Sequence, residues 1–495
     1  MRATMRRLRF FWIATVVLAT SLLAASNDVR LVEAVKNSDK AAIQKLLPQH
    51  IDLSAADTDG STALHWAVRR DDLETANLLL GRGADVKVAN RYGVTPLSLA
   101  CVNGNAAMIE SLLEAGADPN TTLPGGESAL MTAARTGKVA AVKVLITHGA
   151  NVNFAETRRG QTALMWASAE GNTATVEELA ERGADIHART KGGLTPLLFA
   201  VREGRIDTVR SLLKIGADVN ETWKSGRGTG VAGISAMVLA VANAHYELAS
   251  VMLDAGADPN AAAQGWTALH QITWVRKPGK GDNDPAPEGS GNMSSLDLVR
   301  KLVAKGANVN ARMTKSGNVG RTIMNMNGAT PFMMAARTAD APMMRLLAEL
   351  GADPLLPNAD NSTPILAAAG LGTYSPGEDP GTEAEVLAAV KVALEFGGDV
   401  NTVDKNGETV IHAAAYKEVP AVAQYLIEKG AKIELWNTKN KTGWTPLRIA
   451  DGVVRGGGTI RSSPAVAAVL RQSMSAAGVS TVVEPDIVRA GHPVN

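Results

Sequence analysis

Cys101 is the only cysteine among 495 residues, so no disulfide can form within this chain. Aromatic residues make up 4% of the chain, although 45% of its residues are hydrophobic. A chain of this length can bury a large core, which here must be built mainly from Ala, Leu and Val. Cys101 follows Ala100 on the apolar side of a predicted helix, so we expect a buried and unreactive thiol.

Recognisable catalytic motifs are absent as well. The sequence contains no His-Glu-x-x-His metalloprotease motif, no Gly-x-Ser-x-Gly nucleophile elbow and no Gly-Lys-Ser/Thr phosphate loop. The formal net charge of +1 lacks the excess of one sign that would recruit nucleic acid or an anionic membrane. We therefore predict a protein that is not an enzyme, requires no cofactor or metal, and does not bind nucleic acid.

The N-terminus differs in composition from the rest of the chain. Four arginines lie close together at its start: Arg2, Arg6, Arg7 and Arg9. They precede an apolar run at residues 10–25, and Ala24, Ala25 and Ser26 supply small residues for cleavage. The pattern predicts a signal peptide at residues 1–26 and export to the periplasm or the extracellular space. The alternative is a retained membrane anchor, but the run is shorter than the roughly 20 residues that span a bilayer, so we expect no membrane span after cleavage.

Residues 195–220 contain a pattern that recurs along most of the remaining chain. Thr195 and Pro196 begin a predicted short helix, Gly204 ends it, and a second helix runs to Gly216. Helices this short are unstable alone in water and must pack against neighbours. The positions equivalent to Thr195 are Thr62, Thr95, Ser128, Thr162, Ser235, Thr267, Thr330, Thr363, Thr409 and Thr445. The first four distances between successive positions, beginning at Thr62 and ending at Thr195, are 33, 33, 34 and 33 residues.

This period, the helix-start tetrad from Thr62 to His65 and closing segments such as Gly116 to Asn120 resemble the ankyrin repeat. The resemblance extends over nearly all of the chain after residue 27. It implies an all-α ankyrin-repeat solenoid of stacked helix-turn-helix units with short β-turn fingers, comprising about 11 repeats and an N-terminal capping unit. It also implies a scaffold for protein–protein interaction, which we expect to be monomeric and to bind a partner protein through its concave groove and finger tips.

The resemblance divides the chain into four parts after the signal peptide. We predict an N-terminal capping repeat at 27–55, regular repeats at 56–220, repeats with insertions at 221–451, and a C-terminal cap with a flexible tail at 452–495. The insertions are polar and rich in Gly and Pro, and they lie at 222–233, 277–294, 311–328 and 372–381. Long irregular segments are often functional. The alternative function is therefore an enzyme or enzyme subunit whose site is formed by the insertions between 273 and 381.

Matching each repeat to the ankyrin pattern indicates which side chains would face a partner. The predicted partner-binding residues are Trp66, Arg69, Arg70, Arg91, Tyr92, Arg135, Arg158, Arg159, Trp166, Arg189, Phe199 and Arg202. Aromatic side chains beside arginines are typical of binding hot spots, and such a groove favours a partner with acidic and apolar groups. Two alternatives stay open: the arginines could serve solubility while the tryptophans pack on neighbours, or the surface could bind an anionic glycan or peptide.

Three histidines and a cluster of methionines are expected to have structural roles. The histidines occupy the helix-start position at which ankyrin histidines usually hydrogen-bond to the adjoining turn, and they are His65, His270 and His412. The methionines are Met313, Met324, Met326, Met333, Met334, Met343 and Met344. We expect them to fill the core, although an exported cluster of thioethers could instead bind copper(I) or line a partner groove.

Two further patterns resemble ligand-binding motifs only in part. Gly228, Gly230 and Gly233 match the dinucleotide fingerprint as a string, but they lie in an insertion between helical repeats without the required strand. The acidic segment at 282–288 offers oxygen ligands for calcium, but its spacing differs from that of a calcium-binding loop. We therefore expect neither a nucleotide nor a calcium ion to bind at these positions.

Overall fold

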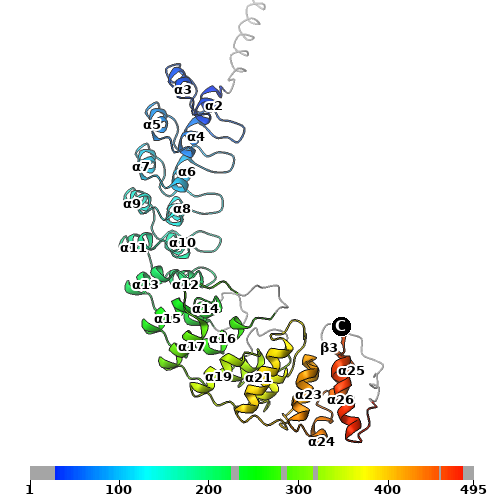
Figure 1. The fold of residues 1–495 in the computed structure, drawn as a ribbon. Coiled ribbons are helices and arrows are strands. Elements are labelled where there is room, and N and C mark those ends of the chain that lie inside the picture. The colour runs from blue at the N-terminus through cyan, green and yellow to red at the C-terminus, as the bar shows by residue number, and fades with distance from the viewer. Residues whose placement is uncertain (1–27, 224–232, 280–286, 316–321, 456–458, 483–495) are drawn as a thin grey trace, which may run out of the picture. The chain divides into compact units, whose positions relative to one another are not determined.

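The computed structural model describes residues 28–223, 233–279, 287–315, 322–455 and 459–482 (Figure 1). These residues form two compact units: the first contains residues up to 200 together with 207–217, and the second contains 201–206 together with residues from 218 onward. The predicted signal peptide at 1–26 and the end of the predicted tail lie outside the described residues. In the described ranges, no helix combines the length and the apolar character needed to cross a membrane.

The first unit is a stack of short helix pairs. Its helices are α2 (Arg30–Lys36), α3 (Lys40–Leu46), α4 (Ala63–Arg69), α5 (Leu73–Gly81), α6 (Pro96–Asn103), α7 (Ala106–Glu114), α8 (Ala129–Thr136), α9 (Val139–Thr147), α10 (Ala163–Glu170) and α11 (Thr173–Glu181), and α12 (Pro196–Arg202) and α13 (Ile206–Lys214) lie at the boundary between the units. Figure 1 shows two rows, in which α4, α6, α8 and α10 pack in sequence beside α5, α7, α9 and α11. This is the predicted helix-turn-helix stack.

The ends of the helices follow from single residues. At the start of α6, the Oγ1 atom of Thr95 accepts a hydrogen bond from the N–H of Ser98 at 3.2 Å, and Pro96 occupies the first helical position. The helix ends at Gly104, whose φ of 72° lies in the left-handed region that glycine adopts without strain. The start and stop signals read from the sequence are therefore confirmed for this helix.

Asparagines in the closing segments join consecutive repeats. Asn120 donates from Nδ2 to the Gly149 carbonyl at 3.1 Å, and its Oδ1 accepts from the N–H of Asn151 at 2.8 Å. In the second unit, Asn401 likewise bonds to the Gly430 carbonyl at 3.2 Å and to the N–H of Lys432 at 2.8 Å. Each asparagine satisfies backbone groups of the next repeat, which explains why this residue recurs in the sequence.

The second unit contains larger and less regular repeats. Its helices are α14 (Ala236–Ala242), α15 (Tyr246–Asp254), α16 (Ala268–Arg276), α17 (Ser295–Ala304), α18 (Pro331–Arg337), α19 (Ala341–Glu349), α20 (Pro364–Ala369), α21 (Glu383–Glu395), α22 (Val410–Lys417), α23 (Pro420–Glu428), α24 (Ile433–Trp436), α25 (Pro446–Asp451) and α26 (Pro464–Ala476). Two short antiparallel ribbons join β1 (Thr222–Trp223) to β2 (Ile234–Ser235) and β3 (Val453–Arg455) to β4 (Thr459–Arg461). The second ribbon lies between α25 and α26.

The described parts of three insertions contact one another in this unit. The N–H of Ile323 donates to the carbonyl of Gly372 at 3.0 Å, which joins the insertion at 311–328 to that at 372–381. A Cβ atom at Gly279 would lie 3.0 Å from the carbonyl oxygen of Glu378, so the backbones of the insertions at 277–294 and 372–381 also approach closely. The described parts of these irregular segments thus pack together.

A buried group of charges holds the last of these insertions against the helices. Asp379 lies 3.5 Å from Arg337 and 3.9 Å from Lys417, and the side chains of all three are at most 6% exposed. Lys417 also donates to the carbonyl of Pro380 at 2.7 Å. Burial lowers the pKa of Lys417 to about 8, although the charge of Asp379 opposes this effect.

The predictions for the sulfur-containing residues are confirmed. All seven methionines between 313 and 344 are buried, and the most accessible of them, Met324, is 6% exposed. Cys101 is fully buried between helices, and this burial raises the pKa of its thiol to about 12. These side chains therefore belong to the hydrophobic core.

The two partial ligand motifs fall largely outside the described residues. Gly228, Gly230 and residues 282–286 are not among them. Within the described ranges, no group of three or more His, Cys, Asp or Glu side chains has an arrangement that could hold a metal ion.

Candidate protein-binding groove

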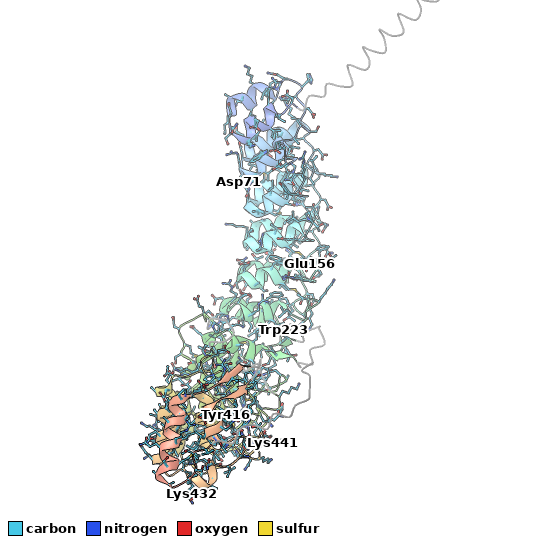
Figure 2. The ribbon with its side chains drawn as sticks, turned by 90° about the vertical axis from the view of Figure 1, so that its right-hand side faces the viewer. Asp71, Glu156, Trp223, Tyr416, Lys432 and Lys441 are labelled. Carbon is cyan, nitrogen blue, oxygen red and sulfur yellow. The ribbon has the colours of Figure 1, made fainter. Side chains whose placement is uncertain are left out.

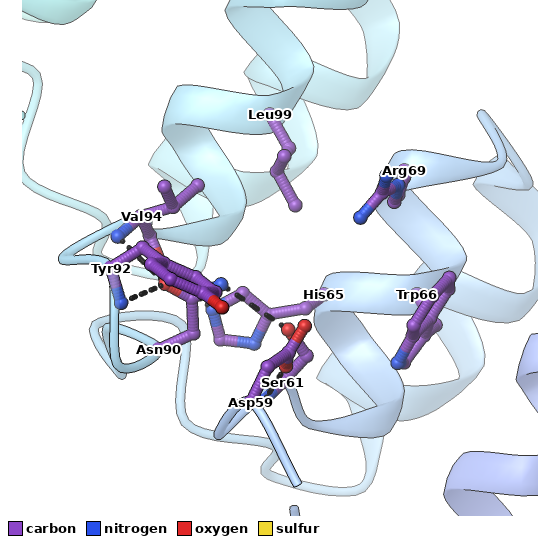
Figure 3. Close-up of a pocket in the computed structure, with 9 residues that line it drawn as sticks. All are labelled: Asp59, Ser61, His65, Trp66, Arg69, Asn90, Tyr92, Val94 and Leu99. Carbon is purple, nitrogen blue, oxygen red and sulfur yellow. Dashed lines mark hydrogen bonds between the residues drawn. The ribbon is translucent and has the colours of Figure 1, made fainter. Parts of the chain in front are cut away.

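A cavity of about 230 Å³ lies beside α4 and α6 in the first unit (Figure 3). Its lining residues are Asp59, Ser61, His65, Trp66, Arg69, Asn90, Tyr92, Val94 and Leu99. Three of them, Trp66, Arg69 and Tyr92, are among the residues that the sequence predicts to bind a partner. We call this cavity, together with its lining residues, the first-unit groove.

His65 fixes the inner wall of the groove. Its Nδ1 atom lies 3.2 Å from the backbone nitrogen of Thr62, and its Nε2 atom lies 3.0 Å from the carbonyl oxygen of Val94. A backbone N–H can only donate, so Nδ1 must be the acceptor and Nε2 must carry the proton. Burial lowers the pKa of His65, which keeps the ring neutral. The predicted structural role of this histidine is confirmed.

The finger turns are shaped by polar side chains that cap their own backbones. The Oδ1 atom of Asn90 accepts from the N–H groups of Tyr92 and Val94, each at 3.0 Å. Asp57 makes the equivalent contacts in the preceding finger, at 3.1 Å to the N–H groups of both Asp59 and Ser61. These bonds present Tyr92 at the rim of the groove, where it is 69% exposed.

Asp57 also orients Trp66. Its Oδ2 atom accepts a hydrogen bond from the indole Nε1 at 2.8 Å. Burial favours the neutral form of Asp57, but hydrogen bonds from neighbouring groups, including this indole, hold the pKa of its carboxyl below the ordinary value. The sequence analysis did not select Asp57. The recurrence of Asp or Asn at the start of the fingers, as at Asn90, Asn358, Asp404 and Asn440, is the signal that could have found it.

Cations lie over Trp66 and Trp166, the two tryptophans in the described part of this unit. The Lys36 ammonium is 5.0 Å and the Arg69 guanidinium 5.2 Å from the centre of the Trp66 ring, and the Arg135 guanidinium is 5.4 Å from that of Trp166. Contacts of this kind are worth about 0.5–1 kcal/mol at exposed sites. They hold each arginine beside an aromatic ring. Such a pair offers a positive charge for an acidic group and an apolar surface for a hydrophobic group.

Most of the other predicted residues lie on the surface of the first unit. The exposed residues of the predicted set are Arg69, Arg70, Arg91, Tyr92, Arg135, Arg158, Arg159 and Arg189, and Trp66 and Trp166 are half-buried. Phe199 is only 5% exposed, because it packs in the core of its helix pair, and it offers a partner little area. Arg202 belongs to the second unit, where it lies 2.8 Å from the carboxylate of Glu203.

Comparison with known proteins identifies the repeats. A family model described as "Ankyrin repeats (3 copies)" matches residues 31–123, 130–223 and 383–452, and one described as "Ankyrin repeat" matches 327–359. Together these matches cover more than half of the chain. Human protein fem-1 homolog A is 34% identical over 85 residues, which are 17% of this chain and 13% of that protein.

The structure is similar to that of the human ASB11 ankyrin repeat domain. The similarity covers 50% of this chain and 99% of that domain, with 24% sequence identity and a TM-score of 0.40. The extent of the family-model matches, which coincide with the stacked helix pairs, decides the assignment. The chain belongs to the ankyrin-repeat family, whose repeats serve as scaffolds for protein–protein interaction.

Proposed function

We propose that the chain is an exported, non-catalytic scaffold that binds a partner protein through the first-unit groove. The observation that carries this proposal is the meeting of Trp66, Arg69 and Tyr92 around one cavity. They come from a helix and from the finger of the next repeat, so only the stacked fold brings them together. An exposed tyrosine, a half-buried tryptophan and an exposed arginine are the residue types that dominate binding energy at interfaces.

The chemistry of the groove favours an acidic and apolar segment of the partner. Arg69 in the groove can receive a carboxylate with two parallel hydrogen bonds, and so can Arg91, which is exposed next to Tyr92 outside the cavity lining. Trp66 and Leu99 provide a partly exposed apolar surface between the finger and the helix. A partner segment that places an acidic residue next to a hydrophobic one would therefore satisfy both kinds of surface. An anionic glycan would use the arginines but not the apolar floor.

A double variant tests this site. Arg69→Glu with Tyr92→Ala should cost about 2 kcal/mol or more of binding free energy, which corresponds to a loss of affinity of about thirty-fold or more and should be seen as a clear loss of captured partner. Both side chains are exposed, so the melting temperature should change little. The measurement is a crosslinking pull-down from the envelope fraction of the source cells, using the tagged chain from residue 27.

The matched control for this experiment places the same kinds of change elsewhere in the first unit. Leu78→Ala with Arg210→Glu removes an exposed apolar side chain and reverses one exposed charge on α5 and α13. This control should capture the partner as well as the wild type does. If the groove variant captures as much partner as the control, the groove is not the binding site.

Export is tested separately by the mass of the protein recovered from its source cells. The arginine-rich start, the apolar run and the small residues at 24–26 support cleavage, so we expect a chain beginning at about residue 26 or 27. Recovery of a chain that keeps residues 1–25 would contradict cleavage, and its fractionation with membranes would favour the anchor.

A further inference from the structure

A second cavity, of about 240 Å³, lies within the second unit where two insertions meet three fingers. Its lining residues are Ile323, Met324, Asn325, Asp360, Ser362, Leu371, Gly372, Asp404, Asn406, Glu408, Lys441 and Thr442. One wall is apolar and includes Ile323, which is 57% exposed. The remaining lining carries the carboxylates of Asp360, Asp404 and Glu408 and the ammonium group of Lys441. We call this cavity the second-unit pocket.

Two of the three carboxylates have their hydrogen bonds satisfied within the protein. Asp360 accepts from the amide of Asn325 at 2.9 Å and from that of Asn406 at 3.1 Å, one on each oxygen. Asp404 accepts from Ser362 Oγ at 2.8 Å on one oxygen, and from two backbone N–H groups on the other. These two side chains hold the fingers in place and contribute negative charge, and each of their carboxylate oxygens already accepts at least one hydrogen bond.

Glu408 differs from both because one of its oxygens has no partner. Its Oε1 atom accepts from the Tyr416 hydroxyl at 3.1 Å and from Asn440 Nδ2 at 2.8 Å. Its Oε2 atom is buried and has no hydrogen-bond partner, and the residue as a whole is only 7% exposed. A buried polar atom without a partner is costly, so this oxygen is an acceptor that a bound donor would satisfy.

We propose that the second-unit pocket receives a lysine side chain of a partner protein, with its ammonium group paired to Glu408. The apolar wall formed by Ile323, Met324 and Leu371 suits the methylene stem of lysine, and the acidic wall suits its head. A compact ammonium fits one unused carboxylate oxygen better than a guanidinium does, because the guanidinium brings five donors in a rigid fork. The proposal does not depend on the first-unit groove.

The protein's own Lys441 is the competing cation. It lines the pocket and is exposed, and Figure 2 labels it together with Tyr416 on the second unit. Because Oε2 of Glu408 is shielded from solvent, entry of a ligand requires a small rotation of the carboxyl group or a displacement of the rim. Removing the charge of Lys441 should therefore strengthen binding, since an incoming ammonium no longer meets a like charge.

The protonation state of Glu408 links this binding to pH. Burial and the nearby Asp404 raise the pKa of Glu408 to about 7, while bonds from Tyr416 and Asn440 oppose that rise. Asp360 and Lys441 are the other charged groups that line the pocket. A cation binds the charged carboxylate, so affinity should increase by about ten-fold between pH 6 and pH 8, as the charged fraction rises.

The test is a nuclear magnetic resonance titration of the chain from residue 27, with labelled methyl groups in Ile and Met. Ile323 and Met324 line the pocket and report on its occupancy. The probe is Nα-acetyl-lysine methylamide, and the norleucine analogue serves as its uncharged counterpart. We expect saturable changes in the chemical shifts of the Ile323 and Met324 methyl groups with the lysine probe and none with the norleucine probe. Glu408→Gln should weaken binding at least ten-fold at pH 8, and Lys441→Met should tighten it.

The controls separate a loss of binding from a loss of folding. Glu434→Gln changes an exposed carboxylate on α24 and should leave the titration unchanged. Lys441→Met alters an exposed side chain and tests the proposal even if Glu408→Gln perturbs the fold. Equal binding of the norleucine probe, or an unchanged affinity in Glu408→Gln, would overturn the proposal. Binding of 1,5-diaminopentane without binding of the lysine probe would also overturn it, because the pocket would then serve a free amine.

Discussion

Asp340→Ala should lower the free energy of unfolding of the second unit by about 3–5 kcal/mol, because it leaves a partly buried guanidinium without its counter-charge. Asp340 is fully buried, and its carboxylate lies 2.6 Å from Nε and 3.1 Å from Nη2 of Arg276. It also caps α19 by accepting from the N–H of Met343 at 3.2 Å. One substitution therefore removes both an ion pair and a helix cap.

Two matched variants separate these contributions. Asp340→Asn keeps a side chain that can cap the helix, so its effect isolates the lost charge. Glu395→Ala removes an ion pair of similar geometry, since Glu395 lies 2.6 and 2.7 Å from Arg345, but both side chains are about half exposed. Exposed pairs contribute little to stability, because water and salt screen their charges.

The measurement is urea unfolding followed by circular dichroism at constant pH. We expect Asp340→Ala to shift the transition of the second unit far more than Glu395→Ala does. Equal shifts of the unfolding transition in Asp340→Ala and Glu395→Ala would contradict this prediction, because the buried ion pair of Asp340 would then stabilise the fold no more than the exposed pair of Glu395.

Acid should destabilise the second unit because two of its histidines are buried in the neutral form. Burial lowers the pKa of both His270 and His412 from 6.5 to about 4. Nδ1 of His412 accepts from the N–H of Thr409 at 3.3 Å, and Nε2 donates to the Trp444 carbonyl at 3.2 Å. Protonation of Nδ1 would place its N–H against the N–H of Thr409, so that two donors would face each other without an acceptor.

The direction and size of the effect follow from linkage. The folded chain binds protons less readily at these histidines, so the unfolded chain takes up more protons between pH 6.5 and pH 4. Stability is therefore lost as the pH falls through this window, by about 3 kcal/mol for each histidine. Glu408 acts in the opposite direction, because its raised pKa favours the folded state as the pH falls from 7 toward 4.5.

A comparison of the wild type with His412→Gln separates these opposing contributions. The variant should be less stable than the wild type at pH 7, because it loses the bonds to both turns. The difference should shrink by about 3 kcal/mol at pH 4, since only the wild type then pays the cost of charging His412. Urea unfolding at half-unit pH steps measures this difference. A difference that stays constant with pH would contradict the buried neutral histidine.

The sequence by itself determined the repeat and its local chemistry. Thr95 caps a helix, Gly104 ends it and His65 bonds to the adjoining turn, and each of these contacts uses neighbouring residues or the next repeat. Such contacts recur at a nearly constant spacing, so the family, the helix pairs and part of the first-unit groove could be predicted. The positions of Trp66 and Tyr92 follow from the same spacing.

Only the tertiary structure decided which irregular segments meet. Lys277 reaches Glu385 at 2.5 Å, although 108 residues separate them, and Ile323 lies beside Gly372 in the second-unit pocket. Insertions break the spacing, so their contacts depend on long-range packing that no local pattern encodes. The burial of Phe199 and the unused oxygen of Glu408 arise in the same way, because both are set by neighbours brought close through folding.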